Sequence, residues 1–390
     1  MSWYLSQIGR REHYALPAYL HSQGGLAMLA TDVWAPWAHS APRMLCPPKL
    51  SQRYSPTLSG ARVVSPALLC AIWNMRYARR PEERWLRIGE SFGKFAAKEF
   101  ARYGLGRDDH VLGFTGGNLE QLIMARQRGA AANHVQVDPG HEWYLTRQLE
   151  QEVHPEVEPM TPMPLSAYME RVEQEWQSSD RIVVHSEHSL QCLVRRGVPA
   201  AKCVVVPPAF TPSTVARPRQ LPGNRPLRVL FVGYHCLAKG FHVFASAARL
   251  AGKGFEFISA GSSGLRDSYA ESVSDVVQMK GHLPQSAVYT LMESADVFVF
   301  PTLSDGFGIV QLEAMSAGLP VIATPPCGAV VRDGIDGFVV PTRDDHAIVD
   351  ALLRLRANEQ LYGDMSQAAV KRAADFSPAS HFASLTASAK

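Results

Sequence analysis

Two acidic residues stand eight positions apart in the segment VFPTLSDGFGIVQLEAMSAGLPVIAT, residues 299–324. Asp305 precedes Gly306-Phe307-Gly308, and Glu313 lies among apolar residues of the helix that these glycines are expected to open. Such a loop leaves backbone N–H groups free to bind an anion, for example a phosphate. A carboxylate buried in an apolar helix needs hydrogen-bond donors, which the hydroxyls of a ribose could supply. The alternatives are an N-cap for Asp305 and a structural hydrogen bond for Glu313.

A single lysine follows the apolar run at 227–233. The segment Tyr234-His235-Cys236-Leu237-Ala238-Lys239-Gly240 leads from that run into the next expected helix. A cation in a loop between a strand and a helix can neutralise a phosphate, and a solvated surface lysine is the alternative. Lys239 is therefore a second candidate for binding an anion.

Two stretches of the N-terminal half place polar residues where strands are expected to end. Gly9, Arg10 and Arg11 follow the first strand, and Asp138 and His141 follow a later one. Ligands of open α/β sheets bind beyond the carboxyl ends of the strands, so both stretches are candidate parts of a site. A solvated turn for the arginines and a turn residue before proline for the aspartate are the alternatives.

The elements that must position these residues indicate a parallel α/β fold. Short apolar runs alternate with helical patterns, because parallel strands need crossover helices between them. Helices are expected at 82–103, 242–250 and 286–294, among others. The expected strands are 2–8, 26–31, 110–114, 133–137, 181–185, 203–206, 227–233, 255–261, 276–281, 296–301 and 319–324.

A proline-rich seam divides this pattern at residues 207–227, which hold six prolines. Such a segment is typical of an interdomain linker. We therefore predict two Rossmann-like domains, 1–212 and 223–390, that face each other across a cleft. The last helix can pack back on the first domain. Two domains arranged in this way suggest two substrates held across the gap.

Composition excludes several classes of protein. The chain has 390 residues, of which 46% are hydrophobic and 19% charged, as in a globular protein and unlike a disordered chain or a coiled coil. No apolar run is long enough to span a bilayer, and the first residues lack the order of a signal peptide. The six scattered cysteines are expected to be reduced thiols, so we expect a cytoplasmic protein.

The net charge of +3 is too small to suggest nucleic-acid binding, and it conceals an uneven distribution. Residues 1–107 hold 15 Lys and Arg against 6 Asp and Glu, whereas residues 108–180 hold 4 against 13. Many of the basic residues lie on or beside the helix expected at 82–103. A solvated helix face is one interpretation. Peripheral contact of the basic N-terminal domain with anionic lipid, on the inner face of a membrane, is the other hypothesis.

The segment at 299–324 resembles the signature of the family 4 glycosyltransferases, which have the GT-B fold. The resemblance covers about residues 180–345 and is diffuse before them. The matching residues are Asp305, Gly306, Phe307, Gly308, Glu313, Ala314, Met315, Gly318, Pro320 and Val321.

This resemblance implies a retaining enzyme that moves a sugar from a UDP- or GDP-linked donor to the hydroxyl of a glycan or lipid-linked acceptor, in bacterial polysaccharide or glycolipid assembly. It implies no cofactor, and we expect no metal because a D-x-D motif is missing from the expected place. The implied catalytic residues are Asp138, Lys239 and Asp305. The implied donor-binding residues are Gly9, Arg10, Tyr234, Lys239, Leu283, Asp305, Gly306, Phe307, Gly308, Ile309 and Glu313, and the implied acceptor-binding residues are Arg11 and His141.

Two positions depart from the family pattern. Asp305 stands where the family usually has glutamate, and Tyr234 stands where it often has an arginine that binds the diphosphate. His235, Arg10 or Arg11 would have to replace that cation. The alternative functions are a sugar-nucleotide epimerase and a catalytically weak nucleotide-binding member of the same fold. A dehydrogenase is disfavoured, because no G-x-G-x-x-G follows the first expected strand.

Overall fold

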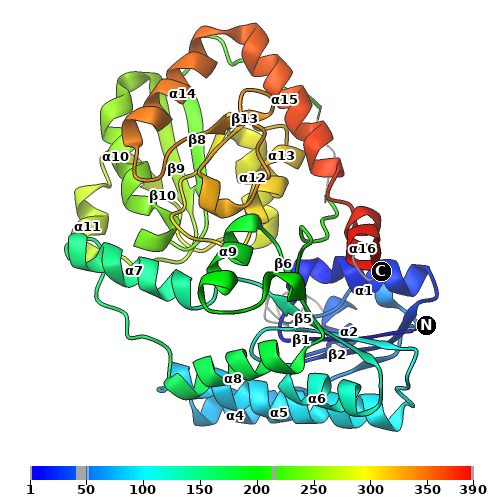
Figure 1. Ribbon diagram of the computed structural model, residues 1–390. Coiled ribbons are helices and arrows are strands. Elements are labelled where there is room, and N and C mark those ends of the chain that lie inside the picture. Colours follow the sequence, from blue (N-terminus) through cyan, green and yellow to red (C-terminus); the bar gives the residue numbers. More distant parts are fainter. Residues whose placement is uncertain (1, 41–49, 51, 213–216, 388–390) are drawn as a thin grey trace.

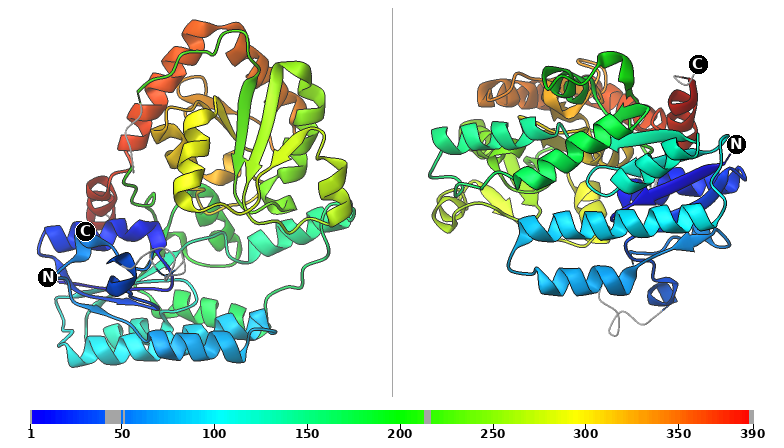
Figure 2. Two further views of the ribbon diagram at one scale, coloured as in Figure 1. Left: turned by 180° about the vertical axis from the view of Figure 1, so that it is seen from behind. Right: turned by 60° about the horizontal axis from the view of Figure 1, so that its bottom comes forward.

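The computed structural model of the protein describes residues 2–40, 50, 52–212 and 217–387. It contains two parallel β-sheets with helices packed against them, one sheet built from the N-terminal half and one from the C-terminal half (Figure 1). Figure 2 shows the same two layered bodies from behind and from below. Among the described residues, none of the helices combines the length and the hydrophobicity needed to cross a bilayer.

The N-terminal sheet has seven strands in the order β3-β2-β1-β4-β5-β6-β7, all paired in parallel. Its strands are β1 (Trp3–Gln7), β2 (Leu26–Thr31), β3 (Val63–Val64), β4 (His110–Phe114), β5 (Ala131–Gln136), β6 (Arg181–Val184) and β7 (Cys203–Val205). The α-helices of this half are α1 (Ala15–Ser22), α2 (Pro36–Ser40), α4 (Ala67–Arg76), α5 (Pro81–Arg102), α6 (Leu119–Gln127), α7 (His141–Val153), α8 (Ser166–Ser178) and α9 (Glu187–Arg195). Every residue of β1 and β4 is buried, because helices cover both faces.

The C-terminal sheet has six strands in the order β10-β9-β8-β11-β12-β13. They are β8 (Leu227–Val232), β9 (Phe255–Ala260), β10 (Val277–Met279), β11 (Val297–Phe300), β12 (Val321–Ala323) and β13 (Gly337–Val339). The helices are α10 (Phe241–Ala251), α11 (Asp267–Ser272), α12 (Gln285–Ser294), α13 (Val310–Ser316), α14 (Asp345–Ala357), α15 (Glu359–Ala374) and α16 (Pro378–Ala387). A core of buried aromatic and aliphatic side chains, including Phe231, Phe244 and Phe298, joins the sheet to these helices.

The sequence-based strands are all present, with ends that differ by about two residues or fewer. The two edge strands β3 and β13, which have two and three residues, were not expected. The helix expected at 82–103 is α5. The described cysteines are free thiols, and Cys46 lies outside the described residues.

The proline-rich segment contains neither helix nor strand in its described parts, 206–212 and 217–226. It is nevertheless fixed to the C-terminal half by two arginines, of which Arg225 forms an ion pair with Asp296 through both of its terminal nitrogens. The Arg219 guanidinium donates hydrogen bonds to the carbonyls of Met292, Glu293 and Ala317, with distances of 2.8–3.0 Å. These carbonyls belong to the ends of α12 and α13, where helices leave acceptors without partners. Residues 217–226 are therefore anchored on the C-terminal half.

Two segments cross between the halves. Helix α16 follows α15 but packs on α1, and Arg181 donates a 2.7 Å hydrogen bond to the carbonyl of Leu385. Residues 141–160, which we call the arm, comprise α7 and the loop after it. The arm lies against the C-terminal half beneath α11 in Figure 1, and the Leu237 N–H donates to Glu158 across this contact at 3.0 Å. An N-terminal segment thus packs on the C-terminal half, and the last helix of the chain packs on the N-terminal half.

Candidate functional site

A cavity of about 470 Å³ lies where the carboxyl ends of the two sheets face each other. The N-terminal half contributes Arg11, Glu12, Phe114, Val137, His185 and Pro208 to its lining. The C-terminal half contributes Val232, Gly233, Tyr234, Lys239, Phe300, Asp305, Phe307, Gly308, Ile309, Val310 and Glu313. Ligands of open α/β sheets bind at this edge.

Lys239 and Asp305 form an ion pair on the C-terminal side of the cavity. Both side chains are mostly buried. Lys239 ends the short 3-10 helix Leu237–Lys239 after β8, and the other oxygen of Asp305 accepts a 2.7 Å hydrogen bond from the Gly306 N–H. The N-cap of α13 is Ile309, without a side-chain hydrogen bond, so the capping alternative for Asp305 is wrong. Asp305 instead holds the ammonium group of Lys239 in place.

Gly306 brings the two halves into direct contact. A Cβ atom at this position would lie 2.0 Å from the carbonyl oxygen of Val137, which no side chain could tolerate. Two positions further, Gly308 has a φ of +69°, a left-handed conformation that favours glycine. The glycines therefore let the loop before α13 approach the end of β5, where Asp138 lies.

Asp138 is held by two hydrogen bonds to one carboxylate oxygen. The Gln136 amide donates at 3.0 Å and the Gly140 N–H at 2.8 Å. Burial raises the pKa of Asp138, and these hydrogen bonds together with the charge of Arg11 oppose that effect. Asp305 is close enough to raise the pKa further, so the two predicted catalytic carboxyl groups lie near each other on opposite sides of the domain contact.

Glu313 projects from α13 with only 12% of its side chain exposed. The Tyr289 hydroxyl donates a long hydrogen bond of 3.4 Å to its Oε1, and the His13 Nε2 lies 3.7 Å from the same atom. Burial raises the pKa of Glu313 to about 7 and lowers that of His13 to about 4, so the ring is neutral at neutral pH. A neutral ring forms no ion pair with Glu313, so the buried carboxyl depends on hydrogen bonds, which Tyr289 and Gln285 supply in part and ribose hydroxyls could complete.

The loop after β1 carries unusual backbone conformations. Glu12, His13 and Tyr14 have φ values of 47°, 53° and 64°, in the left-handed region that non-glycine residues rarely adopt. Such strain gathers at functional sites and persists only where surrounding contacts hold it. Here Arg10 donates a 3.1 Å hydrogen bond to Gln285 of α12, across the domain contact.

Gly9 and Arg11 belong to this loop but lie in different surroundings. The Gly9 N–H donates to Asp32 at 2.9 Å, away from the cavity lining. Arg11 lines the cavity, and its Nε is buried without a hydrogen-bond partner among the described residues. Arg11 is thus the arginine of the N-terminal half among the described residues that line the cavity.

Several predicted residues are not among those that line the cavity; Arg10 and Asp138 lie outside the lining, as do the three described next. His141 is not among the cavity residues; its charged neighbours are Arg196, Glu142 and Glu173, beside α8 and α9. Leu283 lies in the loop before α12, also outside the lining. His235 cannot replace the missing arginine, because burial lowers its pKa to about 4 and its ring stacks on Phe241.

Tyr234 lies in the cavity wall, as predicted, but its ring meets a cation from the arm. The Arg147 guanidinium lies 5.6 Å from the ring centroid, within reach of a cation–π contact. Arg147 also donates to Glu158 at 2.7 Å, so its charge is already paired. The cation of the arm therefore supports the cavity wall.

Two polar residues of the cavity lining, Glu12 and His185, were not predicted from the sequence. His185 directly follows β6 and donates through Nδ1 to the Val206 carbonyl at 2.9 Å, while its Nε2 lies 3.8 Å from the Glu12 carboxylate. A polar residue at the carboxyl end of an expected strand was the available signal for His185. No pattern in the sequence indicates the conformation that turns Glu12 toward it.

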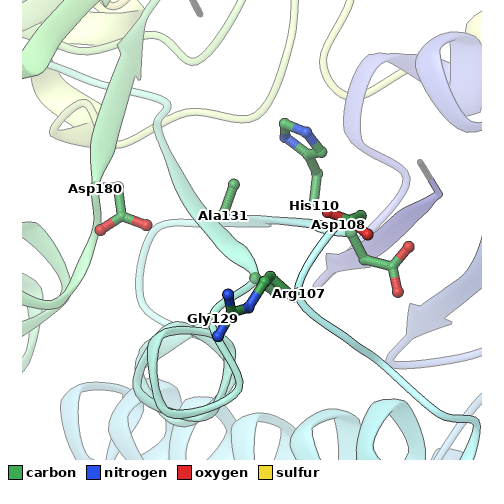
Figure 3. A pocket seen from close by; sticks show the side chains of 8 residues that line it. Arg107, Asp108, His110, Gly129, Ala131 and Asp180 are labelled. Atoms are coloured by element: carbon green, nitrogen blue, oxygen red, sulfur yellow. The ribbon is translucent and has the colours of Figure 1, made fainter.

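A second hollow, shown in Figure 3, lies at the opposite edge of the N-terminal sheet. Its lining includes His110 and Ala131, which begin β4 and β5, and Asp180, which precedes β6. Parallel sheets bind ligands at the carboxyl ends of their strands, and this hollow is at the amino ends. It holds none of the residues predicted from sequence.

Comparison with known proteins finds similarity in the C-terminal half. Residues 226–358 match the model of the family described as Glycosyl transferases group 1. A D-inositol 3-phosphate glycosyltransferase of Paenarthrobacter aurescens is 33% identical over 183 residues, which are 43% of this chain and 45% of that protein. The amylovoran biosynthesis glycosyltransferase AmsK of Erwinia amylovora is 27% identical over 183 residues, again 43% of this chain and 45% of that protein. The matches thus span a little under half the length of these relatives.

Solved structures extend the likeness to the whole fold. The structure of HepE of Anabaena in complex with UDP aligns over 100% of this chain and 100% of its own chain, with a TM-score of 0.62 at 14% identity. The sucrose-phosphate synthase of Thermosynechococcus elongatus covers 99% of this chain and 97% of its own, with a TM-score of 0.62 at 18% identity. The predicted GT-B architecture is confirmed.

Proposed function

We propose that this chain, whose residues 226–358 match the model of the group 1 glycosyl transferases and whose fold is GT-B, transfers a sugar from a nucleoside diphosphate sugar to an acceptor hydroxyl. One observation carries the proposal. The Lys239–Asp305 pair, the glycine loop at 306–308 and the buried Glu313 carboxyl all face one cavity between the two halves. Each has the chemistry that one part of such a donor needs.

The ribose is assigned to Glu313. Its side chain is largely buried, with a long hydrogen bond from Tyr289 and the Gln285 amide beside it, and a carboxylate has acceptor positions left for two neighbouring hydroxyls. Burial destabilises the charged form of Glu313 and so raises its pKa to about 7. Hydrogen bonds from ribose hydroxyls would stabilise that charged form.

The diphosphate is assigned to Lys239, with Arg11 opposite. Negative charge grows on the diphosphate as the glycosyl–phosphate bond breaks, and one preorganised donor aimed at such a charge contributes about 3–4 kcal/mol. A bound diphosphate would compete with Asp305 for Lys239 and leave Asp305 to accept hydrogen bonds from the sugar ring. Arg11, whose Nε lacks a partner among the described residues, would supply the cation that Tyr234 does not.

The acceptor is assigned to the N-terminal side of the cavity. Asp138, fixed by Gln136 and Gly140, would receive a hydrogen bond from a sugar or acceptor hydroxyl. Glu12 and His185 lie on the same side. Approach of the two halves through Gly306 and Val137 would exclude water and bring the substrates into attack geometry. We propose that this chemistry retains the anomeric configuration and requires no divalent metal, since Lys239 and Arg11 supply the positive charge.

The finer substrate assignment rests on analogy with the relatives. Those relatives include inositol phosphate and amylovoran biosynthesis glycosyltransferases, and the HepE structure contains UDP. We therefore propose a UDP- or GDP-linked donor and a glycan or lipid-linked acceptor in bacterial polysaccharide or glycolipid assembly.

We also propose that the N-terminal domain contacts a membrane surface from the cytoplasmic side. Helix α4 exposes Leu68 (76%) and Met75 (72%), together with Ile72, and the following turn exposes Arg79 and Arg80. Apolar side chains flanked by arginines are typical of helices that bind anionic lipid headgroups. Sedimentation with anionic and zwitterionic vesicles at low and high salt tests this. Salt-sensitive binding to anionic vesicles alone supports it, and equal recovery in all supernatants contradicts it.

The assay for the main proposal measures nucleoside diphosphate released from a panel of UDP- and GDP-sugars, with and without saccharide acceptors. Release that depends on the sugar nucleotide supports transfer. Interconverted sugar nucleotide without release would indicate an epimerase. Binding without any conversion across the panel would indicate a nucleotide-binding protein and contradict the proposal. Turnover after exhaustive chelation tests independence from divalent metal.

A further inference from the structure

Three side chains with metal-binding groups meet where the arm packs against α10, outside the cavity. Glu150 and His154 are four residues apart and share one face of α7 and its C-terminal end, while His242 lies in the first turn of α10. One ligand atom from each lies within 4.8 Å of the others. None of the three lines the cavity between the sheets. The cluster therefore joins an N-terminal segment to the C-terminal domain at a place separate from the proposed reaction.

Two polar atoms of this cluster are buried without hydrogen-bond partners among the described residues. They are the Oε2 of Glu150, whose side chain is 5% exposed, and the Nδ1 of His242, whose side chain is 10% exposed. Arg343 donates a 2.8 Å hydrogen bond to the Oε1 of Glu150, whereas Oε2 faces the Nε2 of His242 at 3.5 Å without a hydrogen bond among the described residues. A buried polar atom without a partner is destabilising, and most such atoms in folded proteins have one.

The third ligand is oriented as a metal-binding histidine would be. Glu156 Oε1 lies 3.6 Å from the Nδ1 of His154, which leaves the Nε2 of that ring for a metal. Histidine ligands commonly carry a carboxylate on the nitrogen that does not ligate. The carboxylates of Glu150 and Glu156 outnumber the single guanidinium of Arg343, so the surroundings favour a cation.

We propose that Glu150, His154 and His242 bind a divalent transition metal ion, with zinc as the best fit. Two imidazole nitrogens and one carboxylate oxygen suit zinc, whereas calcium and magnesium prefer oxygen ligands throughout. Three protein ligands leave a fourth position for water. The ion would not take part in sugar transfer.

The arm also contacts the loop that leads to Lys239, and this contact indicates the role of the ion. Beyond the metal ligands, Glu158 accepts the 3.0 Å hydrogen bond from the N–H of Leu237, at the start of the 3-10 helix that ends with Lys239. An ion that ties α7 to α10 would fix the arm, and with it the loop that carries the proposed diphosphate ligand. The site is thus a structural clamp between the domains.

The first test uses the wild-type chain, stripped of metal by a chelator and then dialysed. Zinc is titrated in competition with a chromophoric chelator, and cobalt is added separately so that its visible spectrum reports the coordination geometry. We expect one saturable zinc ion per chain, a tetrahedral cobalt spectrum, and a melting temperature that rises with zinc and not with magnesium. Failure to bind one ion per chain, or an equal response to magnesium, would overturn the proposal.

The second test compares single histidine variants. His154 is partly exposed, so H154N should fold, and H242N gives an independent measurement. Each should weaken zinc binding by at least the 10–100-fold that loss of a second-shell partner produces. H282N, at an exposed histidine outside the cluster, is the matched control and should bind as the wild type does. Equal affinity in H154N and H282N would show adventitious binding to surface histidines and would contradict the site.

Discussion

Replacing Glu313 by glutamine should make the protein more stable and at the same time disable it. Glu313 has a pKa of about 7 in the folded chain because of burial, against 4.5 for the unfolded reference. The folded state therefore binds more protons than the unfolded state between these values, and the free energy of unfolding falls as pH rises through this range. A difference of one in pKa corresponds to about 1.4 kcal/mol, so the full penalty above pH 7 is about 3 kcal/mol.

Glutamine at position 313 has nearly the same shape and no charge, so E313Q should remove this penalty. The midpoint of the C-terminal domain in calorimetry should rise at pH 8 by roughly 2–4 °C for each kcal/mol. At pH 5 the difference between E313Q and the wild type should be much smaller, since most of the wild-type carboxyl is then protonated. E271Q, at an exposed glutamate of the same domain, is the matched control and should leave the midpoint unchanged at both pH values.

The same variant should lose affinity for nucleoside diphosphates. A hydrogen bond to a charged group contributes about 1.5–3 kcal/mol, so weaker acceptance from the ribose should raise Kd by roughly 10–100-fold in isothermal titration. A midpoint for E313Q that is equal to or below that of the wild type at pH 8 would refute the burial argument. Unchanged nucleotide affinity would refute the assignment of Glu313 to the ribose.

Three further substitutions test the rest of the site. K239A should lower the rate of nucleoside diphosphate release by roughly 10²–10³-fold, whereas K253A, at an exposed lysine, should not change it. G306A should reduce turnover without unfolding the chain, because the added Cβ would lie 2.0 Å from the Val137 carbonyl and must push the two halves apart; a wild-type rate would contradict that contact. E158A should raise KM for the donor and lower the melting temperature, because it leaves the buried Arg147 unpaired and frees the loop of Lys239. An unchanged KM would exclude the arm from donor binding.

The strands were predictable because parallel strands covered on both faces are nearly continuous apolar runs. The edge strands Val63–Val64 and Gly337–Val339 are too short to give such a run. The residues around the glycine loop were predictable for a different reason, since Asp305, Gly306–Gly308 and Glu313 are close in sequence and their spacing is local.

Features that depend on contacts between distant segments were not predictable. The arm follows a strand of the N-terminal sheet, but buried partners such as Leu237 hold it on the C-terminal domain. His141 stands near a strand end, yet it is the first residue of α7 and lies beside Arg196 and Glu173 and not in the cavity. The left-handed backbone at Glu12, His13 and Tyr14 was not predictable, because none of them is a glycine or an asparagine, the residues that favour this conformation.

The central claim is that a nucleoside diphosphate sugar lies between the two sheets, held by residues of both. A crystal structure with a bound nucleoside diphosphate tests it most directly. We predict the ribose hydroxyls within hydrogen-bonding distance of the Glu313 carboxylate and the β-phosphate against Lys239 and the backbone at 308–309. A nucleotide bound anywhere else, for example in the hollow at the amino ends of β4 and β5, or a ribose turned away from Glu313, would contradict the account.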